Sequence, residues 1–196
     1  MDKRELQMNI DFSKISESTR YKLMSNTIFP RPIAWITTED EEVVNLAPFS
    51  YFAPISSNPP CVVVSIGHKE AGEMKDTLLN ILKHKVCTIN FAHKEQLEML
   101  KLSANELPKE ISECEKYGIE TKEIIKNFPP MVESSNCALF CEFVQKIDIQ
   151  GEITPIILEI KHIYLKDENI DEKGYIHLEN VGRVGSEFLI DSLRVK

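Results

Sequence analysis

Residues 30–77 read PRPIAWITTEDEEVVNLAPFSYFAPISSNPPCVVVSIGHKEAGEMKDT, and this stretch decides the fold of the chain. It contains two apolar runs rich in β-branched residues, at Ile33–Thr38 and Cys61–Ile66, each typical of a buried strand. Asp76 and Thr77 then precede apolar residues at helical spacing. This pattern predicts a helix that begins here, with Asp76 as its cap.

Further elements on both sides extend the pattern. Strands are predicted at Val86–Phe91, Cys137–Ile149 and Ile156–Lys166, and another begins at Val43 and is interrupted by a turn at Pro48. Short helices are predicted around residues 18–25, 93–103 and 110–117. These elements lack the regular strand–helix alternation of a parallel α/β sheet. They predict an antiparallel barrel, closed or partly closed, with helices around it.

Composition limits the class of protein. The 196 residues suit one domain, with 42% apolar and 28% charged residues. The formal charge of −8 argues against general binding to nucleic acid or to an anionic membrane. No run approaches the roughly 20 apolar residues that cross a bilayer, and the charged start of the chain lacks a signal-peptide pattern. A cytoplasmic protein is therefore expected, with no membrane or nucleic-acid partner.

Cysteine and histidine spacing predicts no metal site. The histidines show no HxxxH spacing, and the five cysteines show no CxxC spacing. Buried free thiols are expected at all five cysteine positions, which are 61, 87, 114, 137 and 141.

Polar residues at two places suit a flat, phosphorylated ligand. Lys75 and Thr77 stand at a helix start, where free backbone N–H groups and the helix dipole favour an anion. Asn45 and Ser50 flank a strand segment in which Pro48 lacks a backbone N–H, so that neighbouring backbone groups are free to contact a ligand. An ordinary capped surface helix and a strand bulge with a buried asparagine explain the same residues without a ligand.

Other candidates carry weaker signals. Ser65 offers a hydroxyl donor, and Gly67 permits close approach of the backbone. Thr37 and Thr38 are adjacent on a strand, so they face opposite sides and one of them points elsewhere. Arg31 suits either a phosphate or carboxylate ligand or a structural salt bridge, while core packing is the default explanation of Trp35, the single tryptophan.

The order and spacing of these motifs resemble the flavin reductase-like proteins of the FMN-binding split-barrel superfamily. The resemblance continues through Asn-Phe-Ala at 90–92, Pro-Pro-Met-Val-Glu-Ser at 129–134 and Cys-Glu at 141–142, and covers about residues 20–190. Two segments depart from it. The turn at 40–42 lacks a glycine, and the 182–190 segment has Ser186 and Leu189 where the family has a glycine and a tyrosine.

The resemblance implies a mainly β protein: an antiparallel Greek-key FMN-binding split barrel of about six strands with flanking α-helices. The barrel domain is expected over residues 30–196, with residues 1–29 as an N-terminal arm packed on it. By this resemblance, we expect fourteen residues to contact FMN or line its pocket: Thr37, Asn45, Leu46, Ala47, Pro48, Phe49, Ser50, Tyr51, Phe52, Ser65, Ile66, Gly67, Lys75 and Thr77.

The resemblance also implies an activity, with no catalytic side chain required because the flavin carries the chemistry. One interpretation is an NAD(P)H-dependent flavin reductase that transfers hydride to flavin N5, with NADH or NADPH as a transient reductant. The alternative is a flavoredoxin-like FMN carrier that relays electrons between redox protein partners without using a nicotinamide directly. A third is an interaction module without flavin. Family members are typically homodimers, so a homodimer is expected.

Overall fold

The computed structural model describes residues 9–151 and 153–190. Its main feature is a seven-stranded antiparallel sheet with the strand order β3-β2-β6-β9-β10-β5-β4. The strands are β2 (Ala34–Asp40), β3 (Val43–Phe49), β4 (Phe52–Ser57), β5 (Pro60–Gly67), β6 (Val86–Asn90), β9 (Cys137–Lys146) and β10 (Ile153–Leu165). The predicted antiparallel β architecture with flanking helices is confirmed, with seven strands in place of about six.

The sheet curls until its two edges nearly meet. Its edge strands β3 and β4 are consecutive in the chain and are joined only by Ser50 and Tyr51. At this corner the Ser65 N–H donates to the Tyr51 carbonyl at 2.8 Å. Beyond it β3 lies beside β5 without strand pairing. We call this gap the seam; it runs between Asn45–Ser50 on one side and Ser65–Lys69 on the other.

The predicted interruption of β3 at Pro48 is wrong. Pro48 lies inside the strand, opposite Trp35 of β2. Because β3 is an edge of the main sheet, a residue without a backbone N–H is tolerated there. The break comes two residues later, at Ser50 and Tyr51, and it creates β4 as the seventh strand.

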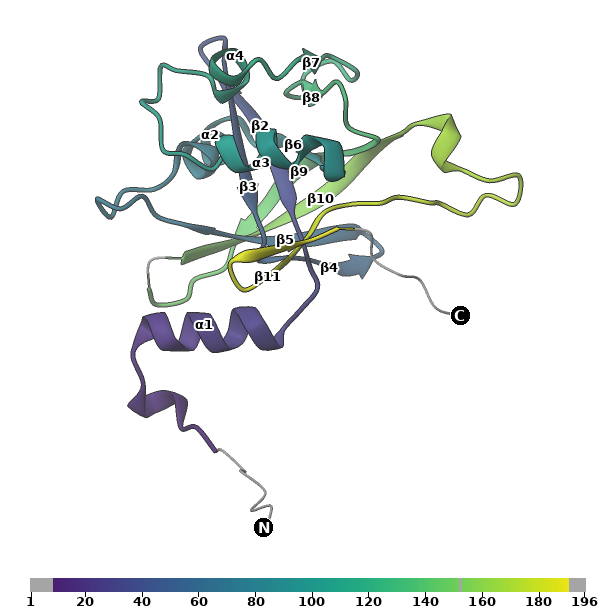
Figure 1. The fold of residues 1–196 in the computed structure, drawn as a ribbon. Coiled ribbons are helices and arrows are strands. Elements are labelled where there is room, and N and C mark those ends of the chain that lie inside the picture. Colours follow the sequence, from purple (N-terminus) through teal and green to yellow (C-terminus); the bar gives the residue numbers. More distant parts are fainter. Residues whose placement is uncertain (1–8, 152, 191–196) are drawn as a thin grey trace.

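Helices lie around both ends of the barrel. Helix α1 lies at one end, and α3 and α4 lie toward the opposite end (Figure 1). The helices are α1 (Glu17–Thr27), α2 (Asp76–His84), α3 (Leu97–Leu102) and α4 (Glu113–Tyr117), with 3-10 turns at Phe12–Lys14, Lys94–Gln96 and Asp167–Asn169. Short strands complete the fold: β1 (Arg31–Pro32), β7 (Thr121–Lys122), β8 (Met131–Val132), β11 (Gly182–Val184) and β12 (Glu187–Leu189).

Helix α2 is anchored by apolar packing. Leu78 and Ile81 are fully buried in the cluster that fills the barrel. Burying a side chain of this size contributes about 1.5–3 kcal/mol. The first turn of α2, which carries Thr77, is therefore held firmly at the end of the seam.

A second core covers the outer face of β2 and β3. Trp35 and Leu46 pack there with Leu100 of α3 and Cys114 of α4. The indole N–H of Trp35 donates to the Ser103 hydroxyl at 2.9 Å. The default explanation of Trp35, core packing, is confirmed.

Asp40 ties three segments together. Its carboxylate lies 2.6 Å from the Lys83 ammonium, 2.7 Å from His84 Nε2 and 2.8 Å from the Lys109 ammonium. Hydrogen bonds from Lys109, Lys83 and His84 hold the pKa of Asp40 far below its usual range. The end of β2, the end of α2 and the segment before α4 are thus fixed to one another.

All five cysteines are buried free thiols, as predicted. Burial raises the pKa of Cys114 to about 12 and that of Cys137 to about 11. These two thiols stay protonated at neutral pH and are poor nucleophiles. Within residues 9–151 and 153–190, no helix has the length and apolar character to cross a membrane.

Candidate functional site

Two hollows lie at the two ends of the seam. The first, which we call the α2 hollow, has a volume of about 30 Å³ and is lined by Asn45, Ala47, Lys69, Lys75, Asp76, Thr77, Ser103, Ala104, Asn105, Glu106, Leu107 and Glu113. The second, which we call the Tyr51 pocket, has a volume of about 240 Å³ and is lined by Met24, Ile28, Arg31, Ser50, Tyr51, Phe52, Ala53, Val63 and Ser65.

The start of α2 forms one wall of the α2 hollow. Lys75 occupies the N-cap position, and no side chain caps the helix there. The prediction that Asp76 is the cap is wrong: Asp76 is the first helical residue, and its carboxylate lies 2.8 Å from the Lys69 ammonium. The first backbone N–H groups of a helix have no partner within the helix, so they are available to a ligand.

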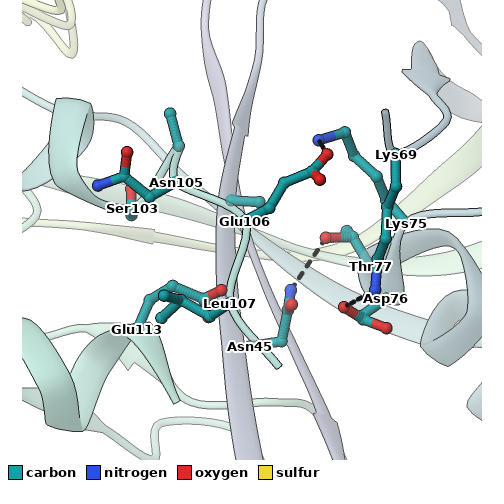
Figure 2. A pocket seen from close by; sticks show the side chains of 12 residues that line it. Asn45, Lys69, Lys75, Asp76, Thr77, Ser103, Asn105, Glu106, Leu107 and Glu113 are labelled. Carbon is teal, nitrogen blue, oxygen red and sulfur yellow. Dashed lines mark hydrogen bonds and ion pairs between the residues drawn. The ribbon is translucent and has the colours of Figure 1, made fainter. Parts of the chain in front are cut away.

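The structure brings together two predicted ligand residues that are 32 positions apart in the chain. Asn45 Nδ2 donates to the Thr77 hydroxyl at 2.9 Å (Figure 2). This contact joins the seam edge of β3 to the first turn of α2. Two polar side chains and a helix start thus converge on one small hollow.

Carboxylates neutralise the cations of the α2 hollow. Glu106 reaches over the hollow, and its Oε1 lies 3.2 Å from the Lys75 ammonium (Figure 2). Glu113 is only 6% exposed, and its Oε2 accepts from the Leu46 N–H at 2.9 Å. Burial raises the pKa of Glu113 above its ordinary value.

Glu106 fills much of the space beside Lys75. With Glu106 in place, about 30 Å³ is room for roughly two water molecules. A phosphate group would fit beside Lys75 only if the Glu106 side chain moved away. The pair is partly exposed, with side-chain exposures of 29% and 39%, so opening it costs little.

The Tyr51 pocket has mostly apolar walls and a basic residue at its edge. The Tyr51 hydroxyl is buried without a hydrogen-bond partner, and burial raises the pKa of Tyr51. Its ring stacks on Tyr21 of α1 at a centroid distance of 5.9 Å. The Arg31 guanidinium lies 5.6 Å from the centre of the Tyr51 ring.

The middle of the seam leaves room for a ligand. A Cβ atom built at Gly67 would meet no other atom within 4 Å. The strand segment from Asn45 to Ser50 spans about 17 Å at ~3.3 Å per residue. FMN, a tricyclic ring with a ribityl chain and a phosphate, has comparable length. The polar start of α2, the open space at Gly67 and the flat apolar pocket therefore fit its three parts.

Thr37 does not line either hollow. Its side chain is fully buried, and its hydroxyl donates to the Pro130 carbonyl at 2.7 Å on the outer face of β2. Thr38 faces the other way and accepts from Asn80 of α2 at 3.1 Å. Thr37 was predicted to line the FMN site, and the structure does not bring it to either hollow, because the alternation of β2 directs it under the 129–132 segment.

Four apolar residues of the predicted lining are core residues. Leu46 and Ile66 are fully buried, and Phe49 and Phe52 are each 8% exposed. Leu46 packs in the outer core and the other three pack inside the barrel. Of the four, Phe52 alone also lines the Tyr51 pocket, and the Leu46 N–H is already bonded to Glu113.

The sequence reasoning missed three residues that line the α2 hollow, namely Lys69, Glu106 and Glu113. It also missed Tyr21, which stacks on the Tyr51 ring. Lys69 follows Ser65–Gly67 closely enough for its position after a strand to have indicated it. Glu106 and Glu113 carry no motif, because loop and helix packing alone brings them to β3.

Comparison with known proteins identifies relatives of this chain and of its fold. The family model described as "flavin reductase like domain" matches residues 24–183. A protein of Deinococcus radiodurans is 31% identical over 187 residues, which cover 90% of this chain and 82% of that protein.

Two solved structures resemble the fold over nearly its whole length. Nitrilotriacetate monooxygenase component B from Bacillus cereus has a TM-score of 0.90 and 26% identity, covering 97% of this chain and 98% of its own. Pseudomonas fluorescens 2-nitrobenzoate 2-nitroreductase has a TM-score of 0.86 and 27% identity, covering 96% and 94%.

Proposed function

The chain belongs to the flavin reductase-like domain family, and from this we propose that it is an FMN-binding oxidoreductase that uses NADH or NADPH to reduce flavin. The FMN phosphate binds in the α2 hollow, the ribityl chain follows the seam past Gly67, and the ring enters the Tyr51 pocket. Lys75, Thr77 and Asn45 hold the phosphate end, and Ser50, Tyr51 and Ser65 surround the ring end.

One observation carries this proposal: a single strand segment links a polar hollow at the start of α2 to an apolar pocket. Asn45 at one end is hydrogen-bonded to Thr77 of α2, and Ser50 at the other end lines the Tyr51 pocket. An elongated ligand with one anionic end and one planar end matches this layout. The open space at Gly67 supports the path between them.

When bound, FMN supplies the redox chemistry, since it accepts hydride at N5 and passes electrons on singly or in pairs. The protein residues bind the phosphate, orient the ring and leave one ring face open to a nicotinamide. No side chain has to act as a general base in this scheme. The similarity to a monooxygenase component supports a role in supplying reduced flavin to a partner.

The first experiment is an absorbance spectrum of the purified protein, followed by steady-state oxidation of NADH and of NADPH with added FMN. We expect visible flavin bands after incubation with FMN, and turnover with at least one of the two nicotinamides. If the protein shows no FMN binding by fluorescence titration, the proposal is wrong.

The same assay separates the reductase from the alternative carrier. A carrier holds FMN tightly, shows no turnover with either nicotinamide and is reduced only by another redox protein. Sedimentation with and without FMN tests the expected homodimer independently. If Asn45→Ala and Thr77→Ala leave the affinity for FMN unchanged, the α2 hollow is not the phosphate site.

A further inference from the structure

Two arginines face each other beside the Tyr51 pocket without a counter-charge. Arg31 of β1 pairs in register with Arg183 of β11. Side chains at directly opposed positions of an antiparallel pair lie on the same face, and like charges there are destabilising. Among residues 9–151 and 153–190, no carboxylate pairs with either arginine.

The bonds of Arg31 leave one edge of its guanidinium group unused. Nη1 donates to the carbonyls of Ser25 and Ile28 at the end of α1. Nε and Nη2 are buried without a partner, and the residue is only 6% exposed. The Nε and Nη2 donors form the edge through which arginine grips a planar acceptor with two parallel hydrogen bonds.

The neighbours of Arg31 add to this deficit of partners. The Tyr51 hydroxyl is also buried and unpartnered. Arg183 stacks on the Phe188 ring at 4.2 Å, and desolvation lowers its pKa. Buried donors without acceptors cost free energy, so they indicate that an acceptor completes this site.

We propose that Arg31, assisted by Arg183 and Tyr51, forms an anion subsite that receives the pyrimidine end of the FMN ring and favours reduced over oxidised FMN. The inference rests on the proposed function. FMN that has accepted a hydride (FMN + H⁻ → FMNH⁻) carries one more negative charge than oxidised FMN, on the N1–C2 side of the ring. A cation near N1 is an established means by which proteins tune a flavin.

The pocket favours this occupant over a free organic acid. Its volume of about 240 Å³ is below the usual range for a pocket that encloses a complete small ligand. Its walls are apolar side chains, including Met24, Ile28 and Val63, which suit the face of a ring. It also lies at the far end of the seam from Lys75, where the ring of a phosphate-anchored FMN would lie.

The test uses Arg31→Gln, which removes the charge and keeps a polar amide donor. We would measure the dissociation constant of oxidised FMN by fluorescence and the midpoint potential of bound FMN by dithionite titration. We expect Arg31→Gln to lower the preference for reduced FMN about tenfold, a shift of about 30 mV to more negative potential for two electrons. Arg31→Lys should recover part of the shift.

Arg20→Gln is the matched control, because Arg20 also donates to a backbone carbonyl, that of Phe12, but lies outside the pocket. Arg183→Gln is the second variant, expected to shift the potential in the same direction if Arg31→Gln does not fold. If both Arg31→Gln and Arg183→Gln bind FMN with an unchanged midpoint potential, this inference is wrong while the proposed function stands. Absence of FMN binding to the wild type would overturn the proposed function and the inference with it.

Discussion

The α2 hollow and the Tyr51 pocket both contain cations, but the two sites hold them in opposite ways. Lys69 and Lys75 in the α2 hollow are each paired with a carboxylate, at 2.8 and 3.2 Å. Arg31 and Arg183 beside the Tyr51 pocket have no carboxylate partner within the described residues. The lysines at one end of the seam thus have carboxylate partners, whereas the arginines at the other end have none among the described residues.

This difference separates two ways of recognising an anion. At the α2 hollow a phosphate must displace Glu106, so net affinity is the gain at Lys75 minus the loss of a partly exposed ion pair worth about 0–1 kcal/mol. At the Tyr51 pocket an electron-rich group meets donors that are already desolvated. The first site should set how tightly FMN binds, and the second should set which redox form binds better.

Removing the Lys75 charge tests the first half of the comparison and should have the largest effect. We expect Lys75→Ala to weaken FMN binding by about 1–3 kcal/mol, because a charge-assisted hydrogen bond to the phosphate is lost. Fluorescence titration measures it as roughly a 5- to 150-fold rise in dissociation constant. Lys101→Ala is the control, since Lys101 pairs with Glu98 at 2.7 Å outside the hollow. An unchanged affinity would remove Lys75 from the site.

Removing the competing carboxylate should have a smaller and opposite effect. We expect Glu106→Gln to strengthen FMN binding up to about fivefold, because Lys75 is then free without an exchange. The matched control is Glu98→Gln, which frees Lys101 and should leave affinity unchanged. Weaker binding in Glu106→Gln would mean that Glu106 contacts the ligand directly and does not block it.

The sequence predicted the β architecture because six of the seven strands of the main sheet carry their own local signal. Ile33–Thr38 and Cys61–Ile66 became the cores of β2 and β5. The sequence also named Asn45 and Thr77 separately as ligand residues, and the structure joins them by a hydrogen bond that the sequence did not predict. The helix predicted around residues 110–117 is α4, which ends at Gly118 with φ of 65°, a conformation that glycine adopts readily.

What the sequence did not predict depends on packing between distant segments. Thr37 was misplaced because strand alternation gives two faces but does not say which face meets the cofactor. Glu106 and Glu113 were missed because the segment before α4 is brought over β3 by bonds such as Lys109 to Asp40. No periodicity encodes such a contact. The unpaired state of Arg31 is likewise visible only once its surroundings are known.

The pH dependence of binding offers the finest test of the α2 hollow, through Glu113. Burial raises the pKa of Glu113, so as pH falls this group is protonated before an ordinary glutamate. The hollow then loses one negative charge and should bind a phosphate more strongly. The FMN phosphate also gains a proton at about pH 6, and this protonation weakens binding. The wild type must therefore be compared with Glu113→Gln, which removes the titration of Glu113 and keeps that of the phosphate.

We expect Glu113→Gln to bind FMN about twofold more tightly than the wild type above the raised pKa, and equally well below it.

The free energy of unfolding should depend on the same titration of Glu113. A carboxyl group whose folded pKa is raised stabilises the fold below its unfolded pKa, and this stability is lost as pH rises through the folded pKa. Urea unfolding should therefore show that the free energy of unfolding of Glu113→Gln rises relative to that of the wild type as the pH approaches neutral.

Glu115→Gln, on the exposed face of α4, controls for the loss of one charge from the same helix. If both variants change binding equally across the pH range, the effect is long-range charge, and Glu113 has no specific place in the comparison between the two ends of the seam.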